Sequence, residues 1–133
     1  MEYNEIEEGS KLQLQFKKRG GLLPVVVQEH ESMQILMLGY VNEEAFEYTL
    51  KSGKATFWST SRNKIWTKGE TSGNTLMMKN ILVDCDQDAI IYQVNLVGEG
   101  VCHTVNQEGK HRKACFYRNF DVNSNTLRFL DEI

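Results

Sequence analysis

The chain has 133 residues, the size of one domain, so we expect a single domain over residues 1–133. A formal net charge of −3 argues against a dedicated nucleic-acid-binding protein, which would need a basic surface. No apolar run reaches the length of a membrane span, and the first ten residues are acidic, unlike a signal sequence. We therefore expect a cytoplasmic protein with no nucleic-acid or membrane partner.

The first predicted elements are two strands. Residues 25–27 and 34–40 are apolar runs that a polar break separates, and Pro24 marks the entry to the first run. Two apolar runs joined by a short polar segment are typical of a hairpin. We expect these two runs to pair.

A helix is expected to follow directly. Asn42 offers a side-chain oxygen to cap the helix start, and the two acidic residues after it suit the positive end of the helix dipole. Gly53 is placed to end the helix. The pattern predicts one principal helix over about residues 43–52, with Phe46 and Leu50 on one face.

The remainder of the chain has mostly the two-residue period of strands. Turns and polar loops separate these segments, and no repeat or low-complexity linker interrupts them. The fold class predicted is therefore α+β, a mainly antiparallel sheet with one principal helix. The further strands are expected at residues 56–59, 65–66, 76–84, 89–97 and 126–130.

Cys85 lies inside a short acidic run, Asp84-Cys85-Asp86-Gln87-Asp88. A cysteine flanked by carboxylates is a poor core residue but a good metal ligand, because a divalent cation offsets the negative charge and stabilises the thiolate. If this segment is extended, its aspartates point to one face and Cys85 to the other. Carboxylate oxygens suit Mg²⁺ or Mn²⁺, whereas thiolates select zinc. The alternative is a solvated acidic turn between strands.

Cys102 and Cys115 bring the number of cysteines to three. An odd number of cysteines without a secretion signal indicates a reducing compartment with free or metal-bound thiols. Three thiolates leave one position of a tetrahedral zinc ion open, which is typical of a catalytic zinc site. His103, beside Cys102, is then a candidate general base or a residue that orients a ligand. The alternative is three inert buried thiols.

A polar loop over residues 66–74 combines glycines, hydroxyl groups and Lys68. Such a loop can present N–H and O–H groups to a phosphate or a sugar, although it is not a Walker loop, because its lysine precedes the glycines. Arg62, Lys64 and the basic run 110–113 offer further contacts to an anion. Each of these patterns is also compatible with an ordinary turn or a solvated charged face.

Together these segments resemble the phosphoribosyl-AMP cyclohydrolase family of histidine biosynthesis, in its monofunctional form without the fused pyrophosphohydrolase domain. No single segment is specific, but the set is, and it runs in family order. Two departures are Val105, where the family usually has glycine, and residues 106–113, a loop that is longer than usual. The matching stretches are residues 36–45, 55–62, 66–74, 83–89, 101–104 and 114–118.

The resemblance implies hydrolytic opening of the N1–C6 bond in the adenine ring of 1-(5-phosphoribosyl)-AMP by a zinc-activated water, the third step of histidine biosynthesis. It implies an intertwined homodimer in which Cys85 of one subunit joins Cys102 and Cys115 of the other around Zn²⁺. In that site His103 is our candidate for the catalytic base.

The resemblance also implies a second metal and a set of contacts to the nucleotide substrate. Mg²⁺ is expected on Asp84, Asp86 and Asp88. The residues expected to bind the substrate are Trp58, Arg62, Lys68, Thr71 and Ser72.

Two rival functions are weighed against this one. A zinc deaminase needs a His-x-Glu and a Pro-Cys-x-x-Cys motif, and neither occurs in the chain. A non-catalytic zinc-stabilised module needs a fourth protein ligand, for which His103 is the best candidate. Adjacent residues of a strand point in opposite directions, so Cys102 and His103 would be awkward as joint ligands.

Overall fold

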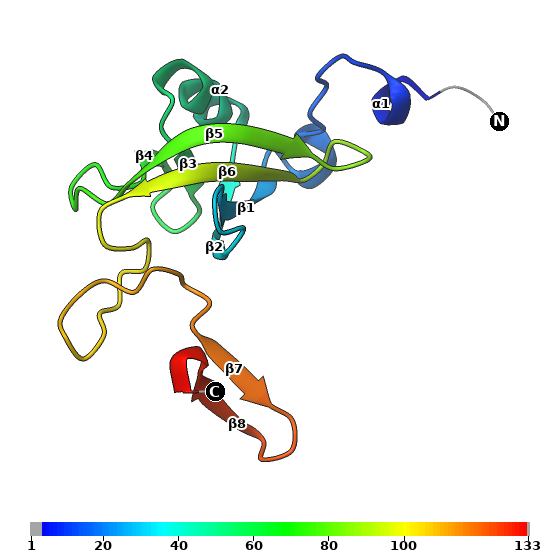
Figure 1. The fold of residues 1–133 in the computed structure, drawn as a ribbon. Helices are drawn as coiled ribbons and strands as arrows, with labels where there is room; N and C mark the ends of the chain where they lie inside the picture. The colour runs from blue at the N-terminus through cyan, green and yellow to red at the C-terminus, as the bar shows by residue number, and fades with distance from the viewer. Residues whose placement is uncertain (1–3, 133) are drawn as a thin grey trace.

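The structure is a computed structural model that describes residues 4–132, and it has a mixed α+β fold (Figure 1). Its main sheet has four strands in the order β2-β1-β6-β5. Strand β1 pairs with β2 in the antiparallel sense, as the sequence predicted, and β5 pairs likewise with β6. The β1–β6 pair at the centre is parallel, which local sequence patterns did not predict. The strands are β1 (Leu23–Glu29), β2 (Ile35–Val41), β5 (Thr75–Val83) and β6 (Ile90–Val97).

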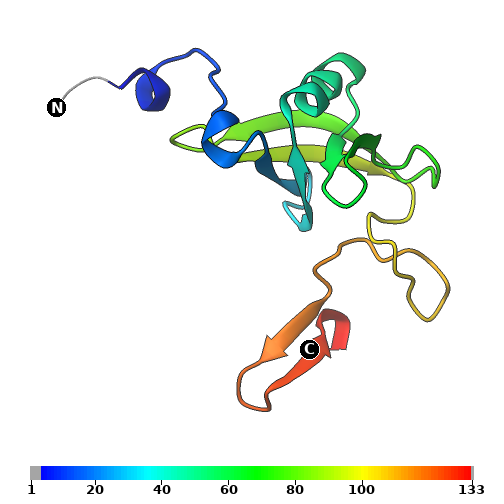
Figure 2. The same cartoon turned by 180° about the vertical axis from the view of Figure 1, so that it is seen from behind.

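Two small antiparallel hairpins accompany this sheet. The β3–β4 hairpin confirms the strands expected near residues 56–59 and 65–66, whereas β7 was not predicted. Both views show the β7–β8 hairpin projecting away from the main sheet (Figures 1 and 2). The hairpin strands are β3 (Thr56–Ser59), β4 (Lys64–Thr67), β7 (Arg118–Asp121) and β8 (Thr126–Phe129), and the short helical pieces are α1 (Glu5–Glu8), η1 (Lys17–Arg19) and η2 (Leu130–Glu132).

The principal helix α2 spans Glu43–Ser52, as predicted. The side-chain oxygen of Asn42 accepts a hydrogen bond from the Ala45 N–H at 2.8 Å, which satisfies one free donor of the first turn. Gly53 ends the helix in the left-handed region, at φ 73°, and its N–H donates to the Thr49 carbonyl. No helix in residues 4–132 is long and apolar enough to cross a membrane.

The buried face of α2 differs from the expected one. Its buried residues are Ala45, Phe46 and Thr49, whereas Leu50 is 56% exposed. At about 100° per residue, Leu50 lies about 40° beyond Phe46, on the side opposite to Thr49. Only the narrow stripe of the helix that contains Ala45, Phe46 and Thr49 packs against the core, and Leu50 lies outside this stripe.

The core holds the β3–β4 hairpin against the main sheet. Strand β1 alternates with the period of a strand, so that Leu23, Val25 and Val27 are fully buried. Gly39 of β2 allows Phe57 of β3 to approach, because a Cβ atom at Gly39 would lie 2.8 Å from the Phe57 ring. This close contact fixes the position of β3, and with it the wall of the pocket described below.

Candidate active site

A pocket with a volume of about 670 Å³ gathers residues from two distant parts of the chain. Its walls come from the β3–β4 hairpin, the loop that follows β4 and the segments around residues 100–103 and 111–115. Trp58 is absent from the lining; it is half-buried on β3, where it pairs with Ile65 of β4. The residues of the predicted site that line the pocket are Arg62, Lys68, Thr71, Ser72, Cys102, His103 and Cys115.

Backbone hydrogen bonds hold Cys102 and Cys115 at this pocket. The Cys102 N–H donates to the Arg112 carbonyl at 3.1 Å, and the Cys115 N–H donates to the Leu36 carbonyl at 2.7 Å. Gly100 makes the first contact possible, since a Cβ atom there would lie 2.2 Å from the Arg112 carbonyl oxygen. The two cysteines therefore reach one pocket because the chain folds back on itself between them.

The two thiols have different electrostatic surroundings. Burial alone would raise the pKa of the Cys102 thiol. Hydrogen bonds with Thr104 and Cys115, together with the positive charge of the nearby Arg112, instead bring this pKa below its ordinary value. The Cys102 sulfur lies 3.0 Å from the Thr104 hydroxyl. Cys115 is exposed as a residue, yet partial desolvation of its thiol, with Cys102 beside it, raises its pKa to about 11. A soft cation would hold both sulfurs as thiolates.

Lys68 is the cation of the pocket that interacts with both thiols. Partial burial lowers the pKa of its ammonium, and the charges of Cys115 and Cys102 oppose this shift. The ammonium also lies 5.6 Å from the centre of the Trp66 ring. Lys68 can therefore offset negative charge on the thiols or on an anionic ligand.

Two histidines line the pocket, and they differ in how they are held. His103 is exposed, and within residues 4–132 its side chain makes no hydrogen bond. In the sequence His111 is part of the basic run 110–113. In the structure its Nδ1 lies 2.9 Å from the Cys102 carbonyl oxygen. Because a carbonyl only accepts, Nδ1 is the donor in this contact, and in the neutral ring Nε2 is then an acceptor. The feature of the sequence that could have identified His111 is its position between Cys102 and Cys115, the two candidate ligands.

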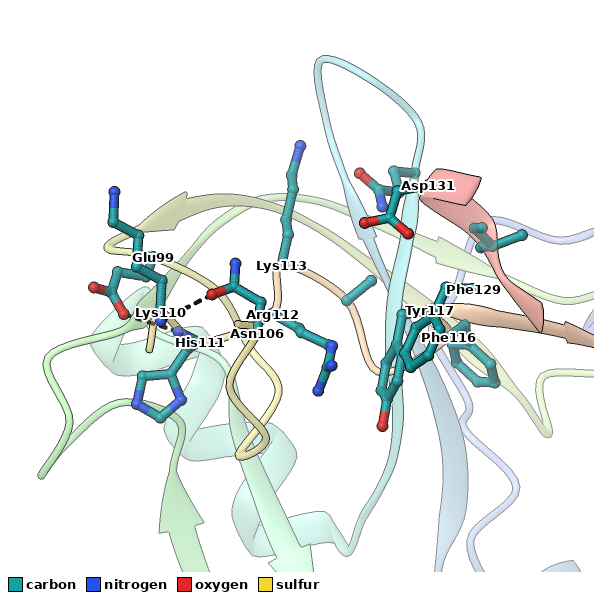
Figure 3. Close-up of a pocket in the computed structure, with 13 residues that line it drawn as sticks. Glu99, Asn106, Lys110, His111, Arg112, Lys113, Phe116, Tyr117, Phe129 and Asp131 are labelled. Atoms are coloured by element: carbon teal, nitrogen blue, oxygen red, sulfur yellow. Dashed lines mark hydrogen bonds between the residues drawn. The ribbon is translucent and has the colours of Figure 1, made fainter. Parts of the chain in front are cut away.

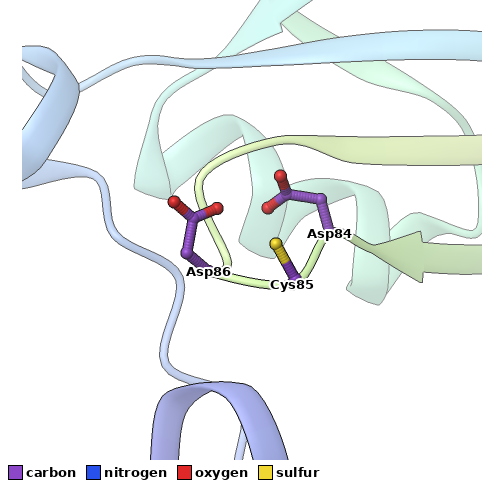
Figure 4. A group of neighbouring side chains, drawn as sticks. All are labelled: Asp84, Cys85 and Asp86. Carbon is purple, nitrogen blue, oxygen red and sulfur yellow. The ribbon is translucent and has the colours of Figure 1, made fainter.

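The acidic run forms a tight turn between β5 and β6, which is the alternative to the extended segment considered above. The Asp84 carboxylate accepts from the Asp88 N–H, and the Asp84 carbonyl accepts from the N–H of Gln87, whose φ is 56°. As a result the ligand atoms of Asp84, Cys85 and Asp86 lie within 4.8 Å of one another. Figure 4 shows these three side chains pointing toward one another rather than to opposite faces.

Asp88 is buried and already has two cationic partners. The Lys18 ammonium lies 2.8 Å from its carboxylate and 2.9 Å from that of Asp86, and the Arg19 guanidinium lies 3.1 Å from Asp88. The hydrogen bond from Lys18, with further help from Asp86 and Arg19, holds the pKa of Asp88 well below its usual range. The carboxylates of Asp86 and Asp88 are thus bridged by an ammonium group.

Cys85 lies at the opposite end of the main sheet from the other two cysteines. It precedes the eight-residue strand β6, and Cys102 follows that strand (Figure 1). At about 3.4 Å per residue, β6 separates the two positions by roughly 25 Å, whereas sulfur ligands lie about 2.3 Å from a zinc ion. One chain therefore brings together two of its three cysteines.

Comparison with known proteins identifies the family of this chain. The family model of phosphoribosyl-AMP cyclohydrolase matches residues 37–117. A phosphoribosyl-AMP cyclohydrolase of Solibacter usitatus is 48% identical over 111 residues, which cover 84% of this chain and 83% of that protein. One of Cenarchaeum symbiosum is 52% identical over 92 residues, 69% of this chain and 84% of the relative.

A longer relative matches as well. A histidine biosynthesis bifunctional protein of Caldanaerobacter subterraneus is 49% identical over 109 residues, which cover 82% of this chain and 49% of that protein. The match to the family model spans more than half of this chain, and the identities to relatives of similar length are close to one half. The chain therefore belongs to the phosphoribosyl-AMP cyclohydrolase family, hydrolases of histidine biosynthesis.

Proposed function

We propose that this chain hydrolyses 1-(5-phosphoribosyl)-AMP by opening the N1–C6 bond of its adenine ring with a zinc-activated water. The observation that carries this proposal is the pocket, which combines a pair of thiols with a cation, hydroxyl groups and a free histidine. Alkylation at N1 makes the ring cationic and C6 electrophilic, so the reaction needs an activated water and a group that takes its proton.

The proposed zinc site consists of Cys102, Cys115 and Cys85 of the partner subunit. Support comes from the contact between the first two thiols and from the distance that β6 places between them and Cys85 of the same chain. A second copy can supply the missing thiol at an exposed turn. When bound, zinc would supply a Lewis acid that acidifies water, with one coordination position left open.

Mg²⁺ is proposed on Asp84, Asp86 and Asp88, whose oxygen atoms are the donors that this ion prefers. The carboxylates of Asp84 and Asp86 already converge, which supports the proposal. Lys18 bridges Asp86 and Asp88, so a divalent cation on all three carboxylates has to displace the Lys18 ammonium. The Lys18 ammonium would therefore compete with the metal ion for these carboxylates.

The remaining roles belong to side chains at the pocket. His103 is exposed at its wall with no hydrogen bond from its side chain, and we propose that it accepts the proton of the attacking water. Lys68 and Arg62 supply positive charge, and the hydroxyl groups of Thr71 and Ser72 supply donors, for a phosphate of the substrate. Trp58 is proposed as a further substrate contact, which would require it to turn toward the pocket.

The central test is an assay of ring opening by the purified full-length chain, with and without a chelator. Turnover of 1-(5-phosphoribosyl)-AMP is expected, together with its loss on removal of zinc and its return when zinc is restored. Tightly bound zinc without turnover would instead indicate a non-catalytic zinc module. Activity that survives complete removal of the metal would contradict the zinc site.

The shared site predicts complementation between two inactive variants. Cys85→Ser and Cys102→Ser should each abolish zinc binding and turnover. In a mixed dimer both substitutions fall in one of the two sites, and the other site is intact. About half of the dimers in a refolded equal mixture are mixed, so the mixture should recover roughly a quarter of the original activity. Recovery is measured by turnover and by zinc per dimer. A mixture that stays inactive, although mass spectrometry detects mixed dimers, would rule out sharing.

His103→Ala should slow turnover by about 10²- to 10⁴-fold, the usual contribution of a general base. Zinc content should not change, because the residue is not proposed as a ligand. Turnover rate and bound zinc are measured on the same sample, and the exposed His30→Ala serves as the matched control. An unchanged rate in His103→Ala would remove this residue from the mechanism.

Lys18→Gln should bind Mn²⁺ or Mg²⁺ about tenfold more tightly than the unmodified chain, because the cation no longer competes with an ammonium for two carboxylates. Calorimetric titration of the zinc-loaded protein measures the affinity. Lys17→Gln is the control, since Lys17 is a neighbouring exposed lysine that makes no ion pair within residues 4–132. Equal affinities in the two variants would show that Lys18 does not occupy the proposed metal position.

A further inference from the structure

A second cavity of about 520 Å³ adjoins the active-site pocket. The loop around residues 106–113 forms one of its sides, and residues of the C-terminal region form the other (Figure 3). His111 lines both cavities, and its ring is held by the carbonyl of Cys102. The two cavities therefore share a wall beside the thiol pair.

Arg112 is held in this second cavity by aromatic rings. Its guanidinium carbon lies 4.3 Å from the centre of the Tyr117 ring and 5.5 Å from that of Phe129. The two rings are themselves stacked, with centres 6.0 Å apart and planes inclined by 17°. A guanidinium that rests on ring faces keeps its in-plane N–H groups available as donors. The rings thus fix the orientation of Arg112 without using its hydrogen bonds.

The lining of the cavity carries charged side chains of both signs. Within residues 4–132, neither Lys110 nor Arg112 forms an ion pair, whereas Lys113 is paired with Glu29 at 2.6 Å. Glu99 and Asp131 are the acidic side chains of the lining, and neither forms an ion pair within residues 4–132. Glu99 accepts a hydrogen bond from the His111 N–H at 3.0 Å. Two cations thus remain without a carboxylate partner at a cavity wide enough for a small anion.

We propose that this second cavity binds a phosphate monoester, with Arg112 as its principal contact and Lys110 as a second cation. A guanidinium presents parallel N–H donors that match two phosphate oxygens, which a lone ammonium cannot do. The inference rests on the proposed function, and it extends that function to the second end of the substrate.

The substrate of that reaction carries two phosphate groups, one on each ribose, on either side of the adenine ring. The active-site pocket offers one set of anion contacts at Lys68 and Arg62. The second cavity offers another set at Arg112 and Lys110, across the wall that His111 shares. A substrate that spans both cavities would place its base near the thiol pair, which lines the active-site pocket.

The test compares three substitutions in the full-length, zinc-loaded protein. Arg112→Gln removes the charge, Arg112→Lys keeps it, and Arg118→Gln is the control. Arg118 also lies on the Tyr117 ring, at 5.4 Å, but it does not line the cavity. The measurements are bound zinc, kcat and KM for 1-(5-phosphoribosyl)-AMP, and the affinity for inorganic phosphate by calorimetry.

Loss of a charge-assisted contact should raise KM in Arg112→Gln by about ten- to a hundredfold, with bound zinc unchanged and kcat altered much less. Arg112→Lys should recover part of this loss, and Arg118→Gln should resemble the unmodified chain. Phosphate affinity should fall in Arg112→Gln by a similar factor. Equal KM values in the Arg112→Gln and Arg118→Gln variants would overturn the inference, as would a loss of zinc that accounts for the whole effect.

Failure of the proposed function is distinguishable from failure of this inference. If the unmodified chain does not convert the substrate, the proposed function fails, and the phosphate titration alone then decides about the cavity. If the chain is active but phosphate binds equally to the unmodified protein and to Arg112→Gln, only the cavity assignment fails.

Discussion

The distance that β6 places between Cys85 and the other two cysteines is the constraint on which the proposed site depends. Cys85 and Cys102 border opposite ends of one extended strand, and an extended strand cannot shorten to bring them together. The backbone contacts of Cys102 and Cys115 with residues 112 and 36 then place two thiols in one pocket. A site with three thiolates therefore requires a second chain, so that assembly and metal binding would be one event, as in other proteins whose metal sites form only in the folded state.

The negative charge of the acidic turn is balanced in part by cationic side chains of the chain itself. Asp86 and Asp88 would repel each other at the tip of a hairpin, and the ammonium of Lys18 lies between them instead. Lys18 lies in η1, outside the residues that match the family model. The affinity of the proposed metal site in this turn would therefore depend on a side chain far from it in the sequence.

The loop over residues 106–113 has a clear structural role. Its return segment places His111 against the Cys102 carbonyl and supplies the Arg112 carbonyl that holds the Cys102 N–H. The side chain of Arg112 then reaches Tyr117 and Phe129 of the C-terminal region. One short segment thus links the thiol pair, the second cavity and the C-terminal hairpin.

The sequence alone determined the local elements of this protein. The cap at Asn42, the stop at Gly53 and the two-residue periods predicted α2 and most strands, because these signals act between neighbouring residues. The motifs around the cysteines also predicted the family. Residues 84–88 left two readings open, because alternating aspartates match a strand in pattern while their side chains and backbone can also close a turn, as they do in the structure.

Only the tertiary structure decided which distant groups meet. The parallel β1–β6 pair, the ion pairs of Lys18 with the acidic turn and the contact of Cys115 with Leu36 each join residues that are more than 60 positions apart. No local pattern encodes such pairs, since they form when separate elements bury their apolar faces against a common core. The same packing separates Cys85 from the other two cysteines and builds the second cavity around Arg112.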